Sequence, residues 1–161
     1  WWYAMPIDNL GKIHFTEEQI QSINEALTLI NTTLLGLSEN LTSAERSKYG
    51  KVGQKNILLI NKARDYHQSQ PGLQSPEVDW NEFELDYKDR SQAAQMLSQT
   101  KSIEQLLLNI RILRDHDNYT DALRDYQYAK YKNRFSGEMG YETKINAMKV
   151  FFPKTGKIQK K

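Results

Sequence analysis

The chain has 161 residues, of which 39% are hydrophobic and 26% are charged, and its formal net charge is +2 at pH 7. This size and composition predict one soluble globular domain. The absence of cysteine excludes disulfide scaffolds, thiolate metal sites and cysteine nucleophiles. No run of eighteen apolar residues is present, so we expect no membrane span. No signal peptide is visible, so we expect a cytoplasmic protein.

Few helix breakers occur, with four prolines and eight glycines, and the abundant Leu, Ile, Gln, Lys and Glu favour an all-α chain. The first expected helix covers residues 17–35, because Thr16 and Gln19 have the spacing of a capping box. Apolar residues then recur three and four apart, which is the period of one helix face. We expect that face to be buried. Its residues are Ile20, Ile23, Leu27, Ile30 and Leu34.

Further start signals divide the rest of the chain. Thr42 and Glu45 form a second capping box for a short helix that ends near Tyr49. Another helix is expected over 54–69, before the turn residues of 71–76. Asp79 and Glu82 then begin a long helix, about 80–115, and the polar residues 115–118 are expected to end it. Two more helices are expected over 119–134 and 141–152, separated by Gly137 and Gly140 and closed by Pro153.

These helices and their short connections predict an antiparallel four-helix-type bundle with one long central helix and a short C-terminal fifth helix. The last two helices are expected to run back along the long one. Residues 1–15 would form an N-terminal arm, in which Trp1, Trp2 and Tyr3 are apolar enough to cap the bundle. Residues 16–153 would form the single bundle domain, and 154–161 a flexible basic tail.

Several stretches, in this order, resemble a family of short bacterial proteins of unknown activity. They are Thr16-Glu17-Glu18-Gln19, Leu41-Thr42-Ser43-Ala44-Glu45-Arg46, Lys51-Val52-Gly53-Gln54-Lys55 and Phe152-Pro153. The likeness covers about 15–153. It implies a helical bundle and transfers no catalytic residue.

Motifs for common chemistry are absent from the sequence. No Glu-x-x-His, His-Glu-x-x-His, Gly-x-Ser-x-Gly, dinucleotide-binding or phosphate-loop pattern occurs,. Asp115, His116 and Asp117 are adjacent, and neighbours on a helix point in different directions, so we interpret them as a solvated helix end. We therefore predict no catalytic, cofactor-binding or metal-binding residue, and no enzyme.

Gly50, Lys51, Gly53 and Lys55 form the first candidate site. Two glycines before a helix leave backbone N–H groups free near the positive end of its dipole, and two lysines stand close by in the sequence. This pattern is typical of an anion site. The alternative is a glycine turn that only directs the next helix.

Aromatic and basic residues alternate in a second candidate site, which consists of Tyr128, Lys130, Tyr131, Lys132 and Arg134. Aromatic rings can stack on bases while cations contact phosphates, and nine bases and two acids follow Gln127. The alternative is that Tyr126 packs inward and the others cover the joint between the last two helices.

We therefore expect a non-enzymatic helical protein that binds an unknown protein partner, associates with itself, or serves a structural role. The alternative is a nucleic-acid or anion-binding module that uses the basic C-terminal third.

Overall fold

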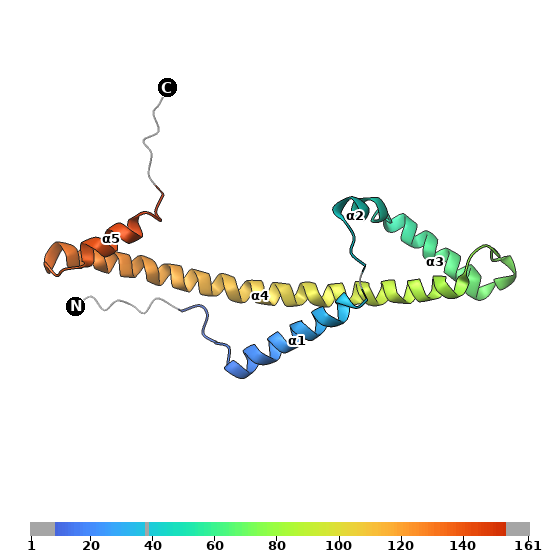
Figure 1. Ribbon diagram of the computed structural model, residues 1–161, viewed down its shortest axis with the longest axis horizontal. Helices are drawn as coiled ribbons and strands as arrows, with labels where there is room; N and C mark the ends of the chain where they lie inside the picture. Colours follow the sequence, from blue (N-terminus) through green and yellow to red (C-terminus); the bar gives the residue numbers. More distant parts are fainter. Residues whose placement is uncertain (1–8, 38, 154–161) are drawn as a thin grey trace, which may run out of the picture. The chain divides into compact units, whose positions relative to one another are not determined.

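The computed structural model describes residues 9–37 and 39–153, and these contain helices and connecting segments with no strand. The elements are α1 (Glu17–Leu35), α2 (Ser43–Tyr49), α3 (Gln54–Ser69), the 3₁₀ helix η1 (Pro71–Leu73), α4 (Trp80–Phe135) and α5 (Tyr141–Lys149) (Figure 1). The all-α prediction, with one long helix and a short C-terminal helix, is confirmed. The predictions for Trp1, Trp2, Tyr3 and the tail 154–161 lie outside the described residues.

The predicted capping boxes set the starts of the first two helices. The Gln19 amide donates to the Thr16 hydroxyl, and the Glu45 amide donates to the Thr42 hydroxyl; both reciprocal bonds are present. At the start of α4, the Glu82 amide donates to the Asp79 carboxylate at 3.1 Å. These side chains satisfy N–H groups that have no partner within the helix, which is why the helices begin there.

The expected end of the long helix at 115–118 is wrong. α4 runs for 56 residues through this segment and includes the helix expected over 119–134. The two expected helices are therefore one, and nothing folds back along the long helix at this point. The physical reason is that no glycine or proline occurs between Trp80 and Phe135. Asp and Asn have low helix propensity, yet each costs well below the about 3 kcal/mol of a proline.

The described residues divide into two units. The first unit contains 15–37 and 39–101, and the second contains 9–14 and 102–153, so that α4 contributes to both. None of the described helices combines the length and apolar character that are needed to cross a bilayer.

In the first unit, α3 and α4 form an antiparallel hairpin. Arg64 Nε donates to both Glu84 carboxylate oxygens, at 3.1 and 3.0 Å, and its guanidinium lies 4.2 Å from the Tyr87 ring centre. The Tyr87 hydroxyl donates to Asn61 Oδ1 at 2.8 Å. Arg64 contacts Glu84, and Asn61, three residues earlier in α3, contacts Tyr87, three residues later in α4. The two helices therefore run antiparallel.

The prediction that the apolar face of α1 is buried is wrong. Ile20, Ile23, Leu27, Ile30 and Leu34, which we call the α1 stripe, are between 37% and 49% exposed. An apolar helix face is buried only when a second apolar surface packs against it. Within the first unit, no described element covers the whole length of the α1 stripe.

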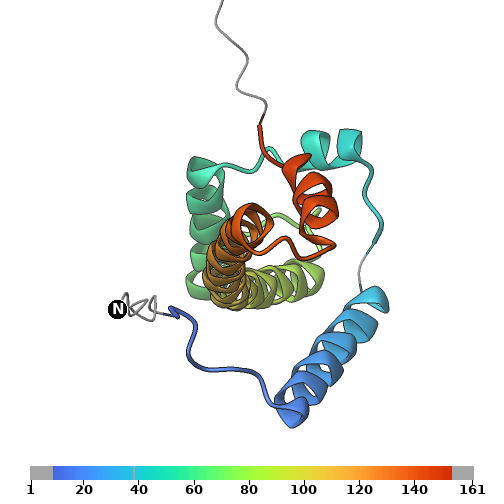
Figure 2. The same ribbon diagram turned by 90° about the vertical axis from the view of Figure 1, so that its left-hand side faces the viewer.

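In the second unit, α5 turns back against the last turns of α4 (Figure 2). Gly137 and Gly140 have φ values of 63° and 96°, which favour glycine and allow the reversal,. Lys144 of α5 forms an ion pair with Asp125 at 2.7 Å. Ala129 is fully buried there. α5 ends at Lys149, three residues before the expected end, because the Phe151 and Phe152 amides bond three residues back in tighter turns,.

Helix continuity can be tested at Asn118. Asn118→Pro would remove a helix hydrogen bond and clash with the preceding turn, so we expect it to lower the free energy of unfolding by about 3 kcal/mol relative to Asn118→Ala. Urea unfolding followed by circular dichroism measures the difference. Equal stability of the two variants would indicate a turn at this position and would contradict a continuous α4.

Candidate functional site

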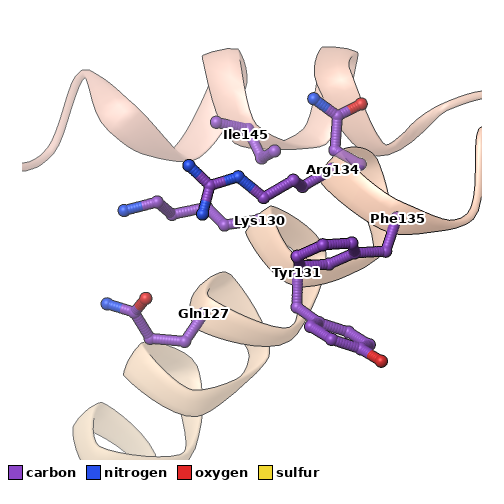
Figure 3. Close-up of a pocket in the computed structure, with 7 residues that line it drawn as sticks. Gln127, Lys130, Tyr131, Arg134, Phe135 and Ile145 are labelled. Carbon is purple, nitrogen blue, oxygen red and sulfur yellow. The ribbon is translucent and has the colours of Figure 1, made fainter.

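A groove in the second unit lies between the end of α4 and α5. Its volume is about 630 Å³, and its lining residues are Gln127, Lys130, Tyr131, Asn133, Arg134, Phe135 and Ile145. All except Ile145 come from α4. In Figure 3, Lys130 and Arg134 extend in the same direction beside Ile145, while Tyr131 and Phe135 lie together on the other side. The groove therefore combines two cations, two aromatic rings and two side-chain amides.

Helix periodicity explains why these residues meet. Gln127, Lys130, Tyr131 and Arg134 are spaced by three or four residues, and such residues are neighbours on a helix surface. Ile145 reaches the groove only because the turn at 136–140 brings α5 back along α4.

The two cations of the groove lack an acidic partner. Among the side chains of 9–37 and 39–153, no carboxylate forms an ion pair with Lys130 or Arg134. Instead, Lys130 Nζ lies 5.5 Å from the Tyr126 ring centre, and the Arg134 guanidinium lies 5.9 Å from that of Phe135. Both positive charges are therefore available to an anion.

Two residues of the predicted aromatic and basic site, Tyr128 and Lys132, do not line the groove. Lys132 Nζ donates to a Glu138 carboxylate oxygen at 2.9 Å, and this hydrogen bond raises the pKa of Lys132. Tyr128 packs edge-on against Tyr141 at 6.3 Å between ring centres. Of the five predicted residues, the groove brings together Lys130, Tyr131 and Arg134.

The sequence prediction missed Gln127, Asn133, Phe135 and Ile145. Gln127 and Asn133 lie three residues from Lys130, and Phe135 lies four residues after Tyr131, so helical spacing could have found all three,. Ile145 had no local signal, because its place depends on the path of the chain after α4.

Gly50, Lys51, Gly53 and Lys55 lie at the junction of α2 and α3. Gly50 ends α2, and a Cβ atom there would be 2.5 Å from the Arg46 carbonyl oxygen, so this position requires glycine. Gly53 is the N-cap of α3 and supplies no side-chain cap. Lys51 and Lys55 are exposed, and no ion pair joins them to a described residue. Gly50 therefore has a structural reason, whereas a Cβ atom at Gly53 would contact no other residue.

The interpretation of Asp115, His116 and Asp117 as a helix end is wrong, because they lie inside α4. Asp117 accepts hydrogen bonds from the Leu10 and Gly11 amides, at 3.1 and 2.8 Å. No three His, Asp or Glu side chains of the described chain come close enough together to hold a metal ion.

Those amide hydrogen bonds attach the segment before α1 to α4 within the second unit. Arg114 also donates to the Ile13 carbonyl oxygen. Gly11 is buried at this contact, and a side chain there would collide with the Arg114 guanidinium. The bond from the Gly11 amide is the largest cause of the lowered pKa of Asp117.

No known protein family, curated protein or solved structure matches the chain. The likeness to a bacterial family therefore stays a prediction.

The lowered pKa of Asp117 predicts a pH dependence. Its stabilising effect is present above the ordinary aspartate pKa of about 3.9 and is lost as pH falls through the lower folded value. We expect the Leu10 and Gly11 amide resonances to shift with that titration in an acid NMR series. Asp117→Asn should weaken both bonds at neutral pH, whereas Asp115→Asn should leave them unchanged. Titration of Asp117 at its ordinary pKa would contradict the contact.

Proposed function

We propose that the chain is a non-enzymatic helical protein that binds a protein partner through apolar side chains left exposed by its own helices. The observation that carries this proposal is the α1 stripe, whose five large side chains are half exposed along one face. Contiguous exposed apolar surface is costly in water and is typical of interaction sites.

The pattern of α1 supports a helical partner. The stripe repeats at three and four residues, which is the spacing that packs side chains into the gaps of a facing helix. The residues that flank it, Asn24, Ala26, Asn31 and Thr33, are uncharged. No like-charge repulsion from these flanks would therefore oppose a second helix.

A groove continues the same surface within the first unit. Its volume is about 550 Å³, and its lining is largely apolar; the lining residues are Leu34, Leu37, Asp89, Gln92, Ala93, Met96, Leu97 and Thr100. Leu34 belongs to both the groove and the α1 stripe. A partner helix on α1 could therefore insert side chains beside α4 as well, as amphipathic helices do in apolar grooves.

Site-specific photo-crosslinking in cells that express the chain tests this proposal. A photoreactive residue in place of Ile23 should give discrete intermolecular products. The matched control is Leu29, which is 68% exposed on the same helix and lies off the stripe. Leu27→Ser should abolish the products. In the purified chain it should cost less than the about 2–5 kcal/mol of a buried leucine, because Leu27 is already exposed.

Only intramolecular crosslinks from position 23, or equal intermolecular yields from positions 23 and 29, would contradict the proposal. The first result would mean that the chain covers the stripe itself. The second would mean that contact with other proteins is unspecific.

A second candidate function is the binding of an anionic ligand, such as single-stranded nucleic acid, in the groove of α4 and α5. The observation that favours it is that Lys130 and Arg134 lack acidic partners beside Tyr131 and Phe135. Cations next to exposed rings can bind a phosphate while a base stacks.

Fluorescence anisotropy with a labelled single-stranded oligonucleotide tests the second candidate. If Lys130 and Arg134 each bind a phosphate, replacing both with glutamine should reduce the slope of log affinity against log salt by about 1.4, since each contact contributes about 0.7. Lys149→Gln is the control, because Lys149 lies outside the groove. No binding at low salt, or an unchanged slope in the double variant, would exclude this groove as the site.

A further inference from the structure

The middle of α4 exposes a second apolar surface, which we call the α4 stripe and which lies within the second unit. It consists of Ile103, Leu106, Leu107, Ile110 and Leu113. Ile110 is half-buried, and the other four are between 39% and 64% exposed. In the described chain, no hydrogen bond, ion pair or ring contact joins residues 103–113 to another helix. Beyond the stripe, Arg114 and Asp117 form hydrogen bonds with the segment before α1.

The charges along α4 indicate what covers this stripe. Residues 80–89 carry four acids and one base (net −3), 90–101 two bases (+2), 102–113 one acid and one base (0), 114–125 four acids and two bases (−2), and 126–135 three bases (+3). The sign of the charge therefore reverses about the middle of the helix, and the neutral middle segment contains the α4 stripe.

The charge pattern of one α4 helix complements that of a second copy only when the two helices run in opposite directions. In an antiparallel pair of α4 helices, each negative segment faces a positive segment of the other copy, and the two neutral apolar segments face each other. In a parallel pair, every charged segment would face a segment of its own sign. Opposite charges favour association and orientation, and like charges oppose them.

We propose that a second copy of this chain covers the α4 stripe, with the two α4 helices antiparallel. This proposal rests on the proposed function, since it names the partner of one exposed apolar surface. Ile103 of one copy then lies near Leu113 of the other, and Leu106 lies near Ile110. The same surface is used on both copies, as in a two-fold symmetric dimer.

Analytical ultracentrifugation tests the dimer. At about 10–100 μM protein, the sedimenting species should have twice the chain mass of 18.8 kDa,. Leu106→Asp should weaken the dimer about tenfold or more, because it would bury an unpaired charge. The matched control is Ile112→Asp, since Ile112 is also exposed, at 53%, and lies off the stripe. Circular dichroism verifies that both variants remain helical.

The orientation can be measured with one spin label, because the chain has no cysteine. Gln95 is exposed and lies on the same side of α4 as the stripe by helical spacing,. In an antiparallel dimer of Gln95→Cys, the two labels should be about 35–40 Å apart, at the usual rise of about 1.5 Å per residue. In a parallel dimer they would be only about 15 Å apart, because the axes of packed helices lie about 10 Å apart.

Salt gives an independent readout of orientation. Raising salt from about 50 to about 500 mM screens the facing charges, so it should weaken an antiparallel dimer and strengthen a parallel one. A short label distance, or tighter association in high salt, would overturn the antiparallel arrangement.

The outcomes also separate this proposal from the proposed function. A chain that stays monomeric at about 100 μM, or equal effects of Leu106→Asp and Ile112→Asp, would overturn the second copy as the partner. Crosslinking of position 23 to a different protein would then still support the proposed function.

Discussion

The structure depends on one constraint: α4 continues for 56 residues because its sequence contains no residue that ends a helix. In the first unit α3 packs on it through Arg64, and in the second unit α5 packs on it through Lys144. The segment before α1 is attached to it through Asp117. Each unit is thus built on a part of the same helix.

The ion pairs that join α3 and α5 to α4 are partly exposed, and such ion pairs contribute only about 0–1 kcal/mol each. They fix the register of the hairpins but supply little of the burial that stabilises folded chains. Among large apolar side chains of the described residues, none is fully buried. Apolar surface on α1 and α4 therefore stays available for burial against a partner. The proposed function uses the α1 stripe, and the proposed dimer uses the α4 stripe.

The two proposed activities would compete for the same charges. Lys130 and Arg134 belong to the basic end of α4, which faces the acidic start of the other copy in an antiparallel pair. An anionic ligand in the groove of α4 and α5 would neutralise these cations and reduce that attraction. Ligand binding and dimerisation would then oppose each other, and the opposition would be reciprocal by linkage.

The sequence by itself determined the helices and most of their ends. The capping boxes at Thr16 and Thr42 and the glycines after α4 are local signals, because they involve residues within about one turn. It also placed Lys130, Tyr131 and Arg134 on adjacent positions of one helix. The sequence also contains the reason why 115–118 continues a helix, since no glycine or proline interrupts 80–135. Tertiary structure alone decided that Asp117 binds backbone amides about a hundred residues away in sequence, and that Ile145 completes the groove. Tertiary structure also decided the exposure of the α1 stripe. An apolar helix face predicts that another surface covers it, but the periodicity of one helix carries no information about which surface that is.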